Sequence, residues 1–115
     1  MIGYAIALLV AAIHFYIAWL EMMTWGSKRT NRIFGISPEL AAQTKAMATN
    51  QGLYNGFLAA GLLFGVAAGL PAMVLFLLLC VGVAGVVGAM TGVPVALKFQ
   101  TLPAVLGLLA IWLGL

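Results

Sequence analysis

The segment from residue 45 to residue 56 holds the most chemically versatile side chains of a chain that is otherwise mostly hydrocarbon. Lys45 heads the segment, and the amides and hydroxyl of Asn50, Gln51, Tyr54 and Asn55 follow it. Only 6% of the residues are charged, so this concentration of polar groups indicates either a ligand-binding site or the polar seam of a helix bundle. Amides orient ligands in pockets, and they also link helices inside membranes. We adopt the site as the working hypothesis.

Two ionisable side chains, His14 and Glu21, interrupt the apolar run that opens the chain. Seven positions separate them, which in an α-helix places both on one face, about 10 Å apart along the axis. An ionisable group within a membrane is a candidate functional group by default, and this pair would suit proton exchange. Alternatively, Glu21 pairs with Lys45 near the interface, and His14 is satisfied by one hydrogen bond to a backbone carbonyl or a hydroxyl.

The sequence lacks the residue sets of several familiar chemistries. It has one histidine and one cysteine, so neither paired metal ligands nor an internal disulfide is expected. It has no Ser-His-Asp set and no phosphate-binding loop. The net charge of +3 is too small and too dispersed for a nucleic-acid surface. We therefore predict no metal, no cofactor and no nucleic-acid partner.

The composition predicts an integral membrane protein. Hydrophobic residues make up 65% of the chain and the mean hydropathy is +1.20, whereas a soluble domain is about 45–50% apolar. A membrane-spanning helix needs about 20 apolar residues, so 115 residues accommodate at most four spans. We predict an all-α, four-helix membrane bundle with short loops, forming a single transmembrane domain over residues 1–115.

Four stretches fit this count, at about residues 2–25, 38–69, 72–90 and 99–115. Residues 26–32 are predicted to form a short basic loop. The second stretch has a strong start at Ser37-Pro38-Glu39, with an N-cap hydroxyl, a proline at the first helical position and an early acid. Its first part is expected to lie at the membrane interface. Rows of small residues on the second and third stretches favour close approach between helices. The approaching helices can belong to one chain or to two copies, so a homo-oligomer is possible.

The basic residues predict an orientation. Lys28, Arg29 and Arg32 lie in the first connection and Lys98 lies in the third. Cytoplasmic loops are enriched in Lys and Arg, and the first and third connections of a four-span chain lie on the same side. We therefore expect both termini on the outer side of the membrane and the polar segment near the cytoplasmic face.

Several of these residues together carry a family resemblance. The chain resembles the small bacterial membrane-protein family catalogued as domain of unknown function 1304 over nearly its whole length, and the segment from Asn50 to Gly56 is the most specific part. The resemblance implies a location in the bacterial inner membrane and lends no activity. The residues that carry it are His14, Glu21-Met22, Trp25, Phe34-Gly35, Ser37-Pro38-Glu39, Lys45 and Asn50-Gln51-Gly52-Leu53-Tyr54-Asn55-Gly56.

We therefore predict a polar pocket between the first two spans that binds or translocates a small amphipathic molecule. Glu21 and His14 would exchange protons, Lys45 would hold an anionic group or Glu21, and the amides would orient the ligand. Two alternatives stay open: an enzyme acting on a lipophilic substrate with Tyr54 or His14 as acid, and a structural or assembly protein. The candidate ligand-binding or proton-handling residues are His14, Glu21, Lys45, Asn50, Gln51, Tyr54 and Asn55, with Tyr16, Lys98 and Gln100 as further contributors.

Overall fold

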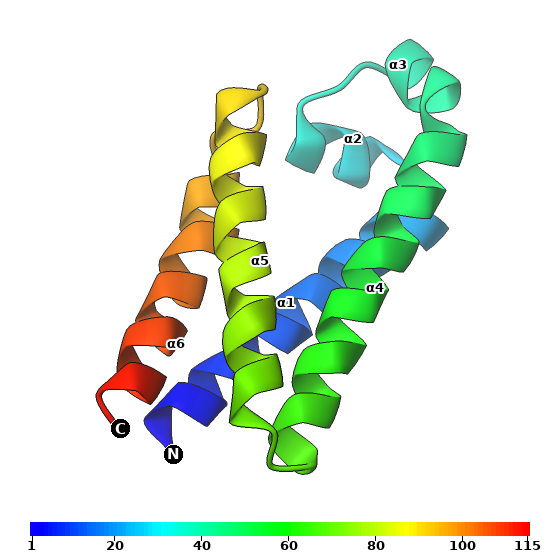
Figure 1. The fold of residues 1–115 in the computed structure, drawn as a ribbon. Helices are drawn as coiled ribbons and strands as arrows, with labels where there is room; N and C mark the ends of the chain where they lie inside the picture. Colours follow the sequence, from blue (N-terminus) through cyan, green and yellow to red (C-terminus); the bar gives the residue numbers. More distant parts are fainter.

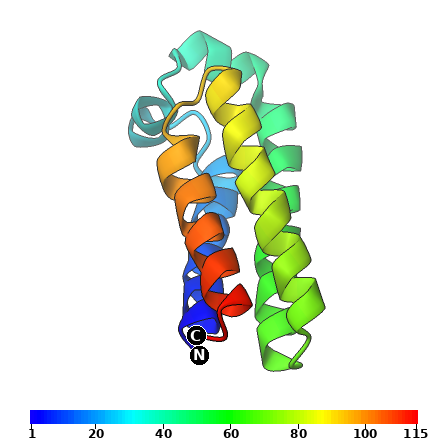
Figure 2. The ribbon, with the colours of Figure 1, turned by 60° about the vertical axis from the view of Figure 1, so that its left-hand side comes forward.

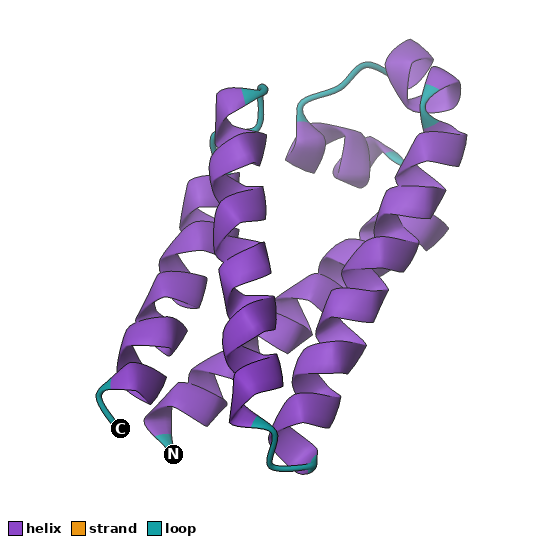
Figure 3. Ribbon diagram, viewed as in Figure 1, coloured by secondary structure: helices purple, strands orange, loops and turns teal.

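The computed structural model describes residues 1–115 and contains helices, turns and no strand (Figure 3). The predicted all-α class is confirmed. The molecule is elongated, with extents of 47 × 25 × 18 Å. Two short helices, α2 and α3, lie at the end where α1 finishes and α4 begins (Figure 1). The elements in chain order are α1 (Ile2–Met23), α2 (Lys28–Phe34), α3 (Pro38–Gln43), α4 (Lys45–Ala67), α5 (Pro71–Met90), the π-helical turn η1 (Leu97–Thr101) and α6 (Leu102–Trp112).

Two of these helices, α1 and α5, are long and apolar enough to cross a membrane. The remaining long helix, α4, begins with the polar segment that defines the candidate site. The fourth predicted span is a shorter apolar helix, Leu97–Trp112, which starts with the turn η1. A π-helical turn suits this place because Pro103 has no N–H to donate to the carbonyl of Phe99. The four-span membrane bundle thus stays a prediction.

The predicted loop over residues 26–32 is wrong, because most of it is helical. The side chain of Ser27 accepts a hydrogen bond from the backbone N–H of Thr30 at 3.2 Å and caps α2. Gly35, with φ of 67°, ends the helix in the left-handed conformation that glycine adopts readily. The seven residues between the caps Ser27 and Gly35 therefore form a helix, although their composition predicts a basic loop.

The second predicted helix begins at Pro38, as expected, and does not run without a break to residue 69. Ser37 caps α3 by accepting a hydrogen bond from the N–H of Leu40 at 3.1 Å. The helical path breaks at Thr44, which has φ of −107° and ψ of 8°. The indole N–H of Trp25 donates to the carbonyl of Ala41 at 3.1 Å and to the Thr44 hydroxyl at 3.2 Å. Residues far apart in the sequence are thus in contact at this break, and no proline or glycine marks its position in the sequence.

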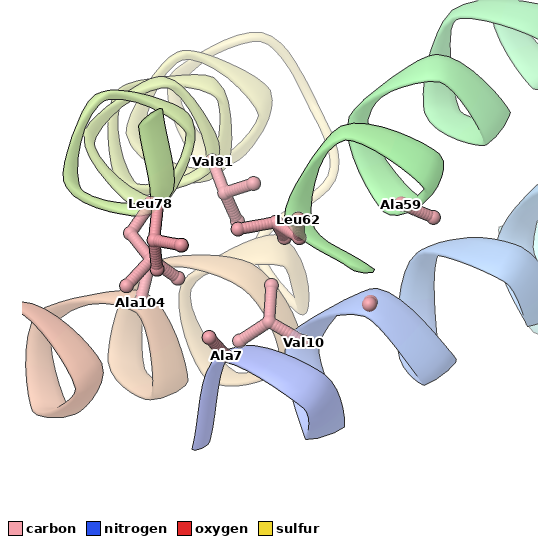
Figure 4. Close-up of a cluster of buried hydrophobic side chains, with 9 residues drawn as sticks. Ala7, Val10, Ala59, Leu62, Leu78, Val81 and Ala104 are labelled. Atoms are coloured by element: carbon pink, nitrogen blue, oxygen red, sulfur yellow. The ribbon is translucent and has the colours of Figure 1, made fainter. Parts of the chain in front are cut away.

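The hydrophobic core lies where α1, α4, α5 and α6 meet. α1 packs against α4 and α6, and α5 packs against α4, η1 and α6. Figure 4 shows Ala7 and Val10 of α1 close to Leu62 of α4, with Leu78 and Val81 of α5 beside them. Alanines in this cluster let the helices approach closely. The nine core residues are Ala7, Val10, Ala11, Ala59, Leu62, Val74, Leu78, Val81 and Ala104.

The two chain ends lie together at the end opposite α2 and α3 (Figures 1 and 2). The amino group of Met1 donates a hydrogen bond to the carbonyl of Leu115 at 2.8 Å. The predicted topology requires this arrangement, with both termini on one side. The side of a membrane that they occupy stays a prediction.

The closest helix approach on α5 is at Gly85, where the backbone meets η1. A Cβ atom at Gly85 would lie 2.8 Å from the backbone nitrogen of Thr101 and 2.9 Å from the carbonyl oxygen of Ala96. A Cβ atom at Gly82, one turn away, would lie 3.8 Å from the Ala104 Cβ, which is an ordinary contact. Of these two glycines, Gly85 is therefore the one that requires the absence of a side chain.

We predict that Gly85→Ala lowers the free energy of unfolding by about 1–3 kcal/mol, the usual effect of overpacking a tight contact. Gly82→Ala is the matched control on the same helix and should be neutral or stabilising by up to about 1 kcal/mol, because alanine favours helix. Thermal unfolding followed by circular dichroism measures both. Equal effects of the two changes would show that α5 and η1 are not packed as described.

Candidate functional site

A cavity of about 520 Å³ lies among α1, α2, α4, α5 and η1, and 13 of its 19 lining residues are hydrophobic. Its polar wall comes from α1 and α4, and its apolar wall comes mainly from α5, η1 and the segment between them. Five of the seven predicted site residues line it, and Tyr16 and Gln100 line it as well. Those five are His14, Glu21, Gln51, Tyr54 and Asn55.

The centre of the polar wall is a hydrogen bond between α1 and α4. The side-chain amide of Asn55 donates to Glu21 Oε1 at 2.6 Å, and the two residues are only 6% and 7% exposed. Gly52 brings the two helices together, since a Cβ there would lie 3.1 Å from both the Ala18 carbonyl oxygen and the Glu21 Cβ. A hydrogen bond is electrostatically stronger in such a buried place than in water. Asn55 thus faces protein, as expected for an amide surrounded by apolar residues.

His14 lies deeper on α1 and is 1% exposed. Its Nδ1 lies 2.9 Å from the carbonyl oxygen of Val10. Because a carbonyl only accepts hydrogen bonds, Nδ1 carries the hydrogen, and Nε2 is the acceptor of the neutral ring. The sequence analysis considered such a hydrogen bond to the backbone as a purely structural role for His14. The bond leaves the other ring nitrogen, Nε2, free for other partners. His14 and Glu21 line the same cavity, which agrees with the predicted shared helix face.

Lys45 and Asn50 do not join this group. Both are exposed, and neither lines the cavity. The pairing of Glu21 with Lys45, which the sequence analysis left open as an alternative, is not formed, because the partner of Glu21 is Asn55. Lys45 precedes Asn55 by ten residues, which is about 15 Å along a helix, so it lies far beyond the level of the carboxylate. Asn50 is rotated by about 140° from Asn55 around α4 and faces outward.

Gln51 and Tyr54 lie at the rim of the cavity. Tyr54 is 56% exposed and stacks edge-to-face on Phe57 with ring centroids 6.0 Å apart. Tyr16, also at the rim, accepts a hydrogen bond from Arg29 at 3.0 Å. The rim therefore combines aromatic rings with hydroxyl and amide groups, which suits the entry of a molecule that is partly polar and partly apolar.

A second, shallower groove of about 300 Å³ lies between α1, α3 and α4. Trp25, Leu40 and Thr44 form part of its wall. Glu21 and Gln51 line both this groove and the larger cavity. The carboxylate thus lies at the boundary of two hollows that follow one another along the same face of α4.

Sequence reasoning missed the apolar residues that complete the cavity. Phe34 packs edge-to-face against Trp25 at 4.9 Å between centroids and lines the cavity from α2, while Ala84 and Gly88 line it from α5. No local pattern distinguishes these residues from others of their type. Among them, only Phe34 had been named from the sequence, as one of the residues that carry the family resemblance.

Taken together, the fold and this geometry define a small all-helical protein with a carboxyl–amide pair in the wall of a mostly apolar cavity. The family model described as Protein of unknown function (DUF1304) matches residues 8–112, and the chain therefore belongs to this family, as the resemblance predicted.

The curated proteins include one further similarity. The chain is 36% identical over 63 residues to the Uncharacterized protein YpaA of Lactococcus lactis subsp. lactis (strain IL1403). The match covers 53% of this chain and 53% of that protein, about half the length of each. No solved structure matches the chain.

We predict that Asn55→Ala lowers the free energy of unfolding by about 1–3 kcal/mol, because it leaves the buried Glu21 carboxylate without its hydrogen-bond donor. Asn50→Ala, the same change on the exposed face of α4, should alter stability by no more than about 0.5 kcal/mol. Thermal unfolding of the two purified variants gives the comparison. Equal losses would mean that the contact between Asn55 and Glu21 contributes nothing to the packing of α1 on α4.

Proposed function

We propose that the chain is a four-span inner-membrane protein whose cavity binds a small amphipathic molecule and passes it across the helix bundle. The exposed side chains of α4 support the membrane location. Phe57, Leu63 and Phe64 are 59%, 49% and 58% exposed, although each would favour an apolar environment by about 1.5–3 kcal/mol when fully buried. Such residues on the outer face of a helix about 35 Å long suit contact with acyl chains.

The shorter segment Leu97–Trp112 has the same character. Leu102, Leu106 and Trp112 are 54%, 49% and 80% exposed. Together with α1 and α5, this gives four helices with apolar outer faces. The four cations of the connections lie on α2 and η1, at the end away from the termini, which by the positive-inside rule is the cytoplasmic end.

Cysteine labelling tests this topology directly, because Cys80 is the only native cysteine and is half-buried within α5. Gln43→Cys and Ala68→Cys flank α4, and both positions are exposed. In a Cys80→Ser background, a membrane-impermeant maleimide should label Ala68→Cys in intact spheroplasts and Gln43→Cys only after the membrane is opened. The reverse pattern would contradict the orientation, and identical labelling at both positions would contradict a membrane-spanning α4.

The observation that carries the binding proposal is the Glu21–Asn55 pair in the wall of a mostly apolar cavity. The cavity volume of about 520 Å³ falls in the range of about 300–1,000 Å³ that is typical of small-molecule sites. Such sites are mostly hydrophobic and carry a few placed polar groups. An apolar chain would lie against Leu58, Ala84 and Val93, and the polar head would reach Glu21 and the neighbouring amides.

Movement of a ligand between the two hollows, as a first step of passage, is supported by the fact that Glu21 and Gln51 line both. A ligand head held by the carboxylate in the cavity would need only a local movement of these side chains to face the groove under α3. Lys45, which the sequence analysis assigned to an anionic group, lines neither hollow and has no part in this proposal.

Narrowing the cavity should displace the ligand. Ala84→Phe places a ring in the cavity wall, and Ala72→Phe makes the same change at an exposed position of α5 that lines neither hollow. Mass spectrometry of purified protein should find the same small molecule on the wild type and on Ala72→Phe, and much less of it on Ala84→Phe. Equal amounts on all three proteins would mean that any ligand binds elsewhere.

The enzyme alternative has its own test. Conversion of a lipid extract to product by the purified protein, lost with Tyr54→Phe, would indicate an enzyme instead.

A further inference from the structure

We propose that the cavity selects ligands whose polar head is a protonated amine attached to an apolar chain. This inference rests on the proposed function and adds the chemical class of the ligand. Glu21 is the only charged residue among those that line the cavity or the groove. A bound head therefore meets no cationic side chain in either hollow, and the one acid there can be neutral or negative but never positive.

The carboxylate has hydrogen-bonding capacity to spare. Oε1 accepts the amide of Asn55, and Oε2 accepts no hydrogen bond from the protein. Asn31 Oδ1 is the only fully enclosed polar side-chain atom without a hydrogen-bond partner. Oε2 of Glu21 has no partner either, so it is not fully enclosed. An ionised carboxylate has about four acceptor positions. Glu21 thus presents an accessible, unpaired oxygen next to an immobilised one.

The neighbouring polar groups supply acceptors as well as donors. The neutral ring of His14 has Nε2 as its acceptor, because Nδ1 donates to the carbonyl of Val10. Gln51 and Gln100 line the cavity, and each supplies a carbonyl oxygen as well as an amide. A primary ammonium group carries three donors and no acceptor, so it can bond to the carboxylate and to two of these acceptors together.

Two cations lie near the rim without entering the cavity. Arg29 contacts the cavity lining through its hydrogen bond to the Tyr16 hydroxyl. The Lys98 ammonium lies 5.6 Å from the ring centroid of Phe99, another lining residue. Both are exposed, so water and salt screen their charges. Glu21 is buried, so the attraction between its ionised form and a bound cation would be screened much less. Charge complementarity inside the cavity therefore favours a cationic head over an anionic one.

A series of head groups on one chain length tests the inference with the full-length protein. The probes are decylamine, decanol and decanoate, and isothermal titration calorimetry at neutral pH measures their binding, with empty micelles as the blank. We expect decylamine to bind at least roughly tenfold more tightly than decanol, as a charge-assisted hydrogen bond requires, and decanoate to bind most weakly. Tighter binding of decanoate would assign the head to Arg29 and Lys98 and overturn the inference. Equal binding of decanol would also overturn it.

Matched variants separate this inference from the proposed function. Glu21→Gln should abolish the preference for the amine over the alcohol, while Glu39→Gln, the same change at an exposed acid outside both hollows, should keep it. Persistence of the preference in Glu21→Gln would overturn the inference. If Glu21→Gln does not fold, the head-group series on the wild type decides alone. If no probe binds the wild type better than Ala84→Phe, the proposed function itself fails.

Discussion

The hydrogen bond between Asn55 and Glu21 is the interaction on which the polar half of the structure depends. A carboxylate that is only 7% exposed costs several kcal/mol in desolvation unless a partner compensates for it. Asn55 supplies that partner at 2.6 Å, and it can do so because Gly52 lets the two helix backbones approach. The pairing of α1 with α4 is therefore apolar at the core alanines and polar nearer to the end where α2 and α3 lie.

The short helices at one end determine what surrounds this bond. Trp25 ties α3 to the end of α1 through its indole N–H, and Phe34 packs against the same indole while lining the cavity. α2 thus contributes an apolar wall to the cavity, and α3 contributes one side of the groove. The segment that a composition argument treats as a connection is part of the site, because its two caps make it rigid enough to pack.

Apolar surface is distributed in an unusual way for so small a chain. The interior is filled largely by alanine, glycine and valine, whereas many leucine and phenylalanine side chains are exposed. In water this arrangement would be unfavourable, since large exposed apolar patches drive association. In a bilayer it is favourable, because small residues permit close helix packing and large ones face lipid. The same arrangement leaves space among α1, α4, α5 and η1, where small residues such as Ala84 and Gly88 line the cavity.

The sequence alone determined the helical class, the start at Pro38 and the membership of the family, because composition, capping residues and the segment from Asn50 to Gly56 are local features. It also placed His14 and Glu21 on one face, since helical periodicity needs no tertiary information. Only the tertiary structure decided the partner of Glu21, the break at Thr44 and the exposure of Lys45 and Asn50. These depend on the level at which two helices cross and on contacts between residues far apart in the chain, and no local pattern records either.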